Sequence, residues 1–149
     1  MILLLFLKTD FVMSDESLRT AGILLVVYPT VVFGGASLLW HWITRRTAYY
    51  DHPLRRSMWR AGHAHAGVLL LLSLVATYLV DHARLADGWK QLVRTTIPAA
   101  ALLLPIAFFL SIVRPEAERP NRLVNLAYLG AISLTIGTFT LGVGLLRAA

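Results

Sequence analysis

The sequence of 149 residues contains no cysteine. Disulfide bonds, thiolate ligation of a metal and covalent attachment of a c-type haem are therefore excluded. Any metal would have to be bound by histidine, carboxylate or tyrosine side chains. Charge is also scarce, since only 15% of the residues are Asp, Glu, Lys or Arg while 57% are hydrophobic. The mean hydropathy of +0.66 is too high for a soluble domain of this size, so we expect the chain to reside in a bilayer.

Four apolar stretches are long enough to span a membrane: residues 20–43, 58–80, 92–113 and 123–146. Their hydrophobicity is continuous rather than alternating, which favours helices over the strands of a barrel. Aromatic rings that mark membrane interfaces lie near the ends of these stretches, namely Trp40, Trp42, Trp59 and Trp89. We therefore predict an all-α fold, a four-transmembrane-helix bundle that forms one domain over residues 20–149.

The first 19 residues are predicted to be an N-terminal leader. The apolar run at residues 2–7 is too short for a signal peptide, and no basic region precedes it. We interpret Met13 as the natural start, which would leave residues 1–12 without a function.

Positive charge is concentrated in two of the three loops. The first loop carries Arg45, Arg46, Arg55, Arg56 and Arg60, and the third carries Arg114, Arg119 and Arg122. The positive-inside rule then predicts that both loops are cytoplasmic and that both termini lie outside. The net charge of +6 indicates membrane orientation and contact with anionic lipids. No basic domain or aromatic platform for nucleic acid is visible, so nucleic acid is not expected as a partner.

Two features predict how the helices pack. In the fourth stretch, Gly130, Gly137 and Gly144 recur at every seventh residue, which allows close helix approach within the bundle or between protomers. In the third stretch, Pro105 removes a backbone hydrogen bond and is expected to kink the helix, which either opens a pocket or only adjusts the packing.

The segment WRAGHAHAG places two histidines, His63 and His65, where the second stretch begins. Residues two apart on a helix point about 200° from each other, so both rings cannot ligate one ion from one helix face. A single imidazole is nevertheless a sufficient axial ligand for haem iron. Small neighbours, Gly62 and Ala66 among them, would leave room for a porphyrin. Arg60, Arg114 and Arg122 could pair with its propionates. The alternative is that both rings only form hydrogen bonds to loop groups at the interface.

The same segment resembles the W-A-R-A-H-S-G segment that opens the second helix of styrene oxide isomerases, small four-helix membrane proteins related to the hydroxylaminobenzene mutases. GILLVVYPTVVFGG in the first stretch is similar to that family's G-I-L-M…L-L-F-G-V-G. FFLSIVRPEAERPNRL after the third is similar to its F-Y-L-F-S-N-F-S-P-N-R. The resemblance covers all but the last helix, in the right order.

This resemblance implies that His65 is the ligand of a ferric haem b, held between the protomers of a homotrimer in a bacterial cytoplasmic membrane. The iron would act as a Lewis acid on a small hydrophobic epoxide, which rearranges to a carbonyl compound by a hydride shift. Two positions depart from the family, because its asparagine is Leu71 here and its tyrosine is Phe109. Neither replacement can form the hydrogen bond that positions the substrate. Tyr28 is one polar substitute, with Ser73 and Tyr78 as others.

Three hypotheses follow. The first is an isomerase-type haem enzyme with His65 as ligand and Tyr28, Leu71 and Phe109 beside the substrate. The second, motivated by Leu71 and Phe109, is a haem-binding sensor or redox protein. The third is a structural or small transport bundle, although no charged residue lies midway along any predicted helix to mark an ion path. The role of His63 is open: it could contact a neighbouring protomer's haem, a propionate or only the first loop.

Overall fold

The computed structural model describes residues 13–114 and 116–149. Within this part the chain contains no strand and forms four long helices: α1 (Asp15–Ile43), α3 (Pro53–Leu79), α4 (Asp87–Leu110) and α5 (Leu126–Leu146). Short elements lie in the connections: α2 (Thr47–Tyr50) and the 3-10 helices η1 (Val80–His82) and η2 (Arg122–Asn125). All four long helices are long and apolar enough to cross a membrane. The predicted all-α four-helix bundle is thereby confirmed, and the chain is an integral membrane protein. The interpretation of residues 1–12 lies outside the described residues.

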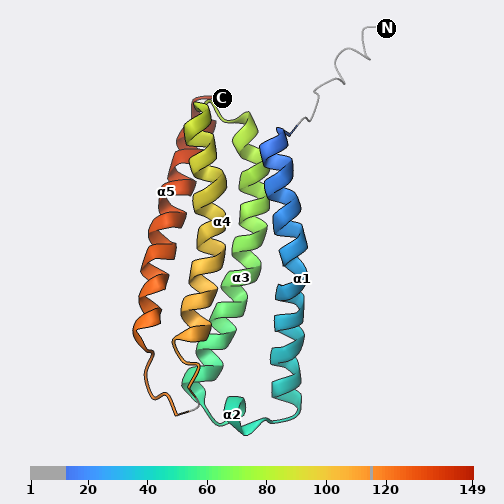
Figure 1. Ribbon diagram of the computed structural model, residues 1–149, viewed down its shortest axis with the longest axis vertical. Coiled ribbons are helices and arrows are strands. Elements are labelled where there is room, and N and C mark those ends of the chain that lie inside the picture. Colours follow the sequence, from blue (N-terminus) through green and yellow to red (C-terminus); the bar gives the residue numbers. More distant parts are fainter. Residues whose placement is uncertain (1–12, 115) are drawn as a thin grey trace, which may run out of the picture.

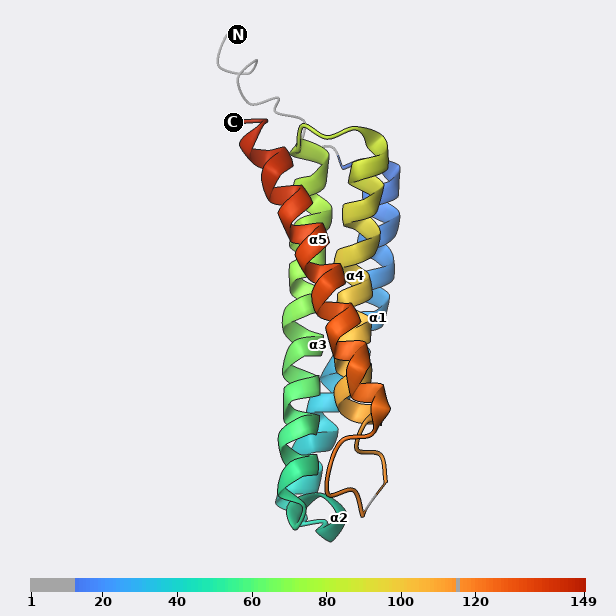
Figure 2. The same cartoon turned by 90° about the vertical axis from the view of Figure 1, so that its left-hand side faces the viewer.

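The long helices do not surround one common axis evenly. Helices α3 and α4 lie in the middle, with α1 packed mainly on α3 and α5 packed mainly on α4 (Figure 1). Figure 2 shows α5 crossing the bundle obliquely. The start of α1 and the end of α5 lie at one end of the bundle, and α2 lies at the other (Figure 1). The arginine-rich first connection is therefore remote from both of these helix ends.

Two helices begin earlier than the hydropathy of the sequence predicts. Helix α1 begins at Asp15 rather than at residue 20, and Ser14 caps it by accepting a hydrogen bond from the Ser17 amide at 3.2 Å. Residues 14–19, which the sequence analysis assigned to a leader, thus belong to the cap and first turns of α1. Helix α3 begins at Pro53 rather than at residue 58, and proline suits this position because its missing N–H would have no helical partner.

The glycine stripe of α5 packs within the bundle. A Cβ atom added at Gly137 would lie 2.5 Å from the Ile97 side chain of α4, and one at Gly130 would lie 2.9 Å from the Leu104 side chain. At Gly144 the same addition would come within 2.5 Å of Leu85 in the connection before α4. The α5 stripe therefore lets the two helices approach closely, which is one of the two roles left open by the sequence.

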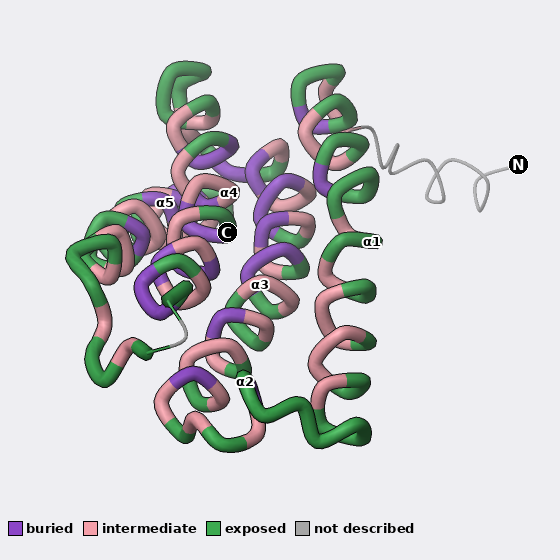
Figure 3. The backbone as a smooth tube through the Cα atoms, turned by 60° about the horizontal axis from the view of Figure 1, so that its bottom comes forward, coloured by how far each residue is buried: buried purple, intermediate pink, exposed green. Residues whose placement is uncertain are grey.

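Burial decreases from the middle helices towards α1. The buried apolar core is formed mostly by α3 and α4, whereas α1 contributes only Ser17 and Leu24 as buried residues (Figure 3). Because α1 packs on α3 and contacts α4 little, space remains between α1 and α4. That space forms a groove.

Candidate functional site

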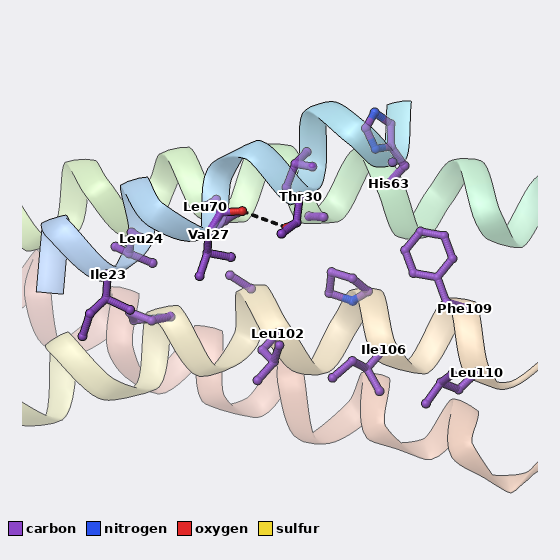
Figure 4. A pocket seen from close by; sticks show the side chains of 16 residues that line it. Ile23, Leu24, Val27, Thr30, His63, Leu70, Leu102, Ile106, Phe109 and Leu110 are labelled. Atoms are coloured by element: carbon purple, nitrogen blue, oxygen red, sulfur yellow. Dashed lines mark hydrogen bonds between the residues drawn. The ribbon is translucent and has the colours of Figure 1, made fainter. Parts of the chain in front are cut away.

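A groove of about 460 Å³ lies between α1, α3 and α4 (Figure 4). Both prolines of α4, Pro98 and Pro105, line it. Mostly apolar side chains line the groove. Several of these side chains, including Ile23, Val27 and Leu102, are exposed at the outer surface of the helices. In a single protomer within a membrane this surface would face lipid, and the groove would open towards the hydrocarbon.

Polar side chains are rare in the groove, where His63 is the one titratable group of the lining. The Thr30 hydroxyl already donates to the Val27 carbonyl oxygen at 2.8 Å, within its own helix (Figure 4). His63 and Phe109 lie together at one end of the groove (Figure 4). In the described part of the chain, no hydrogen bond joins a ring nitrogen of His63 to another group. Among the described lining residues, the Thr30 hydroxyl can therefore only accept a further hydrogen bond, whereas the His63 ring has both its donor and its acceptor unused.

Two glycines of α1 make room for the His63 ring. A Cβ atom added at Gly35 would lie 3.0 Å from both Cε1 and Nε2 of His63, and one at Gly34 would lie 3.6 Å from Nδ1. A larger residue at Gly35 would have to displace the ring. The GG pair of α1 thus positions the imidazole at the groove.

His65 is on another face of α3, as the helical geometry predicts. Its side chain is exposed, and Nδ1 donates to the Ala61 carbonyl oxygen at 2.7 Å. A nitrogen that bonds a carbonyl must carry a proton, so in the neutral form of this ring Nε2 is the nitrogen with the lone pair. The ring lies 5.0 Å from the Phe108 ring, measured between centroids. The structure therefore separates the two histidines into a groove residue and a surface residue.

The other predicted site residues are also divided between the groove and other parts of the bundle. Ala66 and Phe109 line the groove with His63. Gly62 is buried, and a Cβ atom there would meet Phe109 at 3.1 Å. Tyr28 is half-buried against the apolar core, and Leu71 is 50% exposed. The proposed catalytic set of His65, Tyr28, Leu71 and Phe109 is thus not brought together within one protomer.

The predicted propionate partners are all at the surface. Arg60 lines a depression of about 540 Å³ together with Arg56, Ala61 and Ala64 on the outer face of α3. Arg114 and Arg122, on either side of the third connection, are exposed. Arg60 is the one of the three that shares a surface depression with Ala61, the residue bonded to His65.

A cluster of aromatic rings closes the arginine-rich end of the bundle. Tyr49 and Trp59 stack at 5.9 Å, and the Arg55 guanidinium lies 5.4 Å from the Trp59 ring. Arg55 is 6% exposed, and its Nη1 donates to the Ala48 carbonyl oxygen at 2.8 Å. Sequence reasoning counted Arg55 among the topology-setting charges of the first loop, whereas the structure gives it a packing role.

Sequence reasoning also missed a buried ion pair at the opposite end. Arg94 Nη2 lies 2.6 Å from Asp81 Oδ1, with side-chain exposures of 7% and 10%. Ser14 donates to both Asp81 oxygens, and Arg94 Nε donates to the Ser17 hydroxyl at 2.9 Å. The sequence did contain a signal for this ion pair, because Arg94 falls inside the predicted third span and a charged side chain in a membrane span requires a partner. These contacts tie the start of α1 to η1 and α4.

Among the described residues, no three His, Asp or Glu side chains are grouped so that they could hold a metal ion. Comparisons with family models, curated proteins and solved structures find no match to this chain. Its function is therefore inferred from the two histidines, their surroundings and the sequence resemblance.

Proposed function

We propose that this protein binds haem b through His65 and acts as an isomerase of the styrene oxide isomerase type on a small hydrophobic epoxide. The observation that carries the proposal is the hydrogen bond from His65 Nδ1 to the Ala61 carbonyl oxygen, at 2.7 Å. Histidines that ligate metals commonly donate the other ring N–H to a carbonyl, which fixes the tautomer and the ring orientation. His65 has this arrangement, and its exposed ring leaves Nε2 accessible to a ligand. His41 and His82 bond the Ser37 and Tyr78 carbonyl oxygens in the same way, so the sequence resemblance is what selects His65 among the three.

We expect the surface next to His65 to accept one face of a porphyrin. Ala61 and Ala64 present only methyl groups, so a flat macrocycle can approach the helix. Arg60 lines the same depression and can pair with a propionate, whereas Arg56 beside it already donates to the Tyr50 carbonyl oxygen at 2.8 Å. Since His65 lies on the outer face of α3, one protomer covers only one side of the group. The proposal therefore includes a homo-oligomer, a trimer by resemblance, in which a second copy covers the other side.

When bound, ferric haem b supplies a Lewis acid that can polarise the C–O bond of an epoxide. The residues of this chain would bind the haem, surround the substrate with apolar side chains and exclude water. Water would otherwise open the epoxide to a diol. Leu71 and Val68, both exposed, provide such an apolar surface on α3. Topology belongs to the same proposal, with the arginine-rich end cytoplasmic and both termini outside.

Absorption spectra of the purified protein test the haem. We expect a Soret band in the wild type and in His63→Ala, and its loss in His65→Ala, because of these two histidines His65 is the one that bonds a carbonyl oxygen through Nδ1 and presents an exposed ring. A missing Soret band in the wild type, or one that persists unchanged in His65→Ala, would reject haem ligation by His65.

Activity is tested separately, by incubating the haem-loaded protein with a panel of aryl and alkyl epoxides and measuring carbonyl products. Aldehyde formation that is lost in His65→Ala supports the isomerase. A protein with a Soret band and no product would instead be a haem-binding sensor or redox protein. That second candidate is favoured by Leu71 and Phe109, neither of which can form a hydrogen bond to an epoxide oxygen.

A further inference from the structure

We infer that the groove between α1, α3 and α4 is a second binding site, which takes a small apolar molecule carrying one hydrogen-bonding oxygen held by His63. This site is separate from the proposed haem site, because His63 lines the groove while His65 is exposed on another face of α3. It does not rest on the proposed function, since occupation of the groove requires no haem.

The dimensions of the groove suit a small molecule. Its volume of about 460 Å³ lies within the range of roughly 300–1,000 Å³ that is usual for ligand pockets. The walls offer aliphatic and aromatic surface from three helices, including Leu70, Ile106 and Phe109. Such pockets bind the body of a ligand by apolar contact and use a few polar groups to orient it.

His63 is the group that orients the ligand. Within an apolar surrounding, a polar group that lacks a hydrogen-bond partner is costly, so a ligand that supplies one is favoured. A neutral imidazole can donate to a carbonyl, ether or epoxide oxygen and can accept from a hydroxyl. Gly34 and Gly35 leave room for the ring on the α1 side, where a Cβ atom at Gly35 would lie 3.0 Å from Nε2. The Thr30 hydroxyl donates to the Val27 carbonyl oxygen and can only accept from a ligand, whereas a neutral His63 ring can both donate and accept.

The ligand would enter from the bilayer. Ile23, Val27 and Leu102 are 57%, 40% and 61% exposed at the mouth, on the surface that faces lipid. A molecule that partitions into membranes therefore reaches the groove without crossing a polar barrier. A lipid acyl chain could enter by the same route, but it would leave the His63 ring nitrogens without a partner.

Photolabelling in lipid nanodiscs tests this site. The probe is a benzyl alcohol that carries a trifluoromethyl-diazirine group, and its control is the matching toluene derivative without the hydroxyl. We expect the alcohol to label groove residues such as Val27, Ile106 and Phe109, as mapped by mass spectrometry, more strongly than the toluene derivative does. His63→Ala should reduce this labelling about fivefold, the effect of one neutral hydrogen bond.

Two alanines of α3 provide matched variants. Ala66→Phe fills the groove and should abolish the labelling there, whereas Ala64→Phe adds the same side chain on the outer face and should leave it unchanged. Equal labelling by both probes, or labelling unchanged in His63→Ala, would show occupation by any apolar chain and overturn the role of His63. Labelling that persists in Ala66→Phe would overturn the site itself. All measurements are made without added haem, so a failure here is distinct from a failure of haem binding.

Discussion

Replacing Arg94 with alanine is expected to lower the free energy of unfolding by about 3–5 kcal/mol, the usual cost of breaking a buried ion pair. The carboxylate of Asp81, which is 10% exposed, would lose its charged partner at 2.6 Å. Ser14 would still donate to both carboxylate oxygens, and among the described residues the cation still bonded to Asp81 would be Lys90, through the backbone carbonyl oxygen at 3.3 Å and not through the carboxylate. The destabilisation arises mainly from this uncompensated charge and less from the lost attraction itself.

The same substitution should loosen α1. Arg94 donates to the hydroxyls of Ser14 and Ser17, and these bonds join the start of α1 to α4. Elsewhere α1 and α4 are separated by the groove, and α1 contributes only two buried residues. Amide hydrogen exchange should therefore rise first at the beginning of α1, because local opening follows the loss of its few anchoring contacts.

The stability change is measured by denaturant titration in mixed micelles, with helix content and tryptophan fluorescence as probes. Arg84→Ala is the control, since it removes an arginine that is exposed at the same end of the bundle, and its effect should be within about 0.5 kcal/mol. Arg94→Met combined with Asp81→Leu removes both charges and should be less damaging than Arg94→Ala alone. If Arg94→Ala behaves like Arg84→Ala, the ion pair does not stabilise the bundle.

The sequence was sufficient to predict the four membrane helices, because a continuous apolar run of this length has few alternatives in a bilayer. It was less informative about where they begin. Hydropathy reports the hydrocarbon-facing part of a helix, whereas Asp15 and Pro53 begin helices in segments that are polar and suited to capping. The leader assigned to residues 1–19 was drawn from hydropathy and therefore included the Ser14 cap and the first turns of α1.

The divergence of His63 and His65 was predictable from residue spacing, but the groove was not. The spacing of two residues on a helix predicts only that the two rings point in different directions. Which ring lies at a cavity depends on how α1 packs on α3 and on the room that Gly35 leaves for the imidazole. The Asp81–Arg94 pair is likewise a tertiary contact between η1 and α4, so composition could show the two charges but not their meeting.

The glycine stripe of α5 leads to the second large effect. Gly137→Ala is expected to destabilise the protein by about 1–3 kcal/mol, the typical cost of inserting a methyl group into a packed interface. The new Cβ atom would lie 2.5 Å from Cγ1 of Ile97 and 2.5 Å from Oγ1 of Thr96, and 3.3 Å from the Ile97 backbone nitrogen. Relief by side-chain rotation is limited, because the Thr96 hydroxyl donates to the Leu92 carbonyl oxygen at 2.8 Å and Ile97 is fully buried.

The helices would therefore have to separate, which would also lengthen the hydrogen bond from the Ser133 hydroxyl to the Thr96 carbonyl oxygen, now 2.8 Å. Gly142→Ala is the matched control, because it adds the same methyl group to the same helix where nothing lies within 4 Å. Alanine favours helix over glycine by up to about 1 kcal/mol, so this variant should be neutral or slightly stabilised in the same denaturant titration. If the two variants change the free energy of unfolding in opposite directions, close α4–α5 contact, and not helix propensity, accounts for the glycine at residue 137. Equal effects would mean that α5 can move away from α4 at little cost, and the stripe would then have no role in packing the bundle.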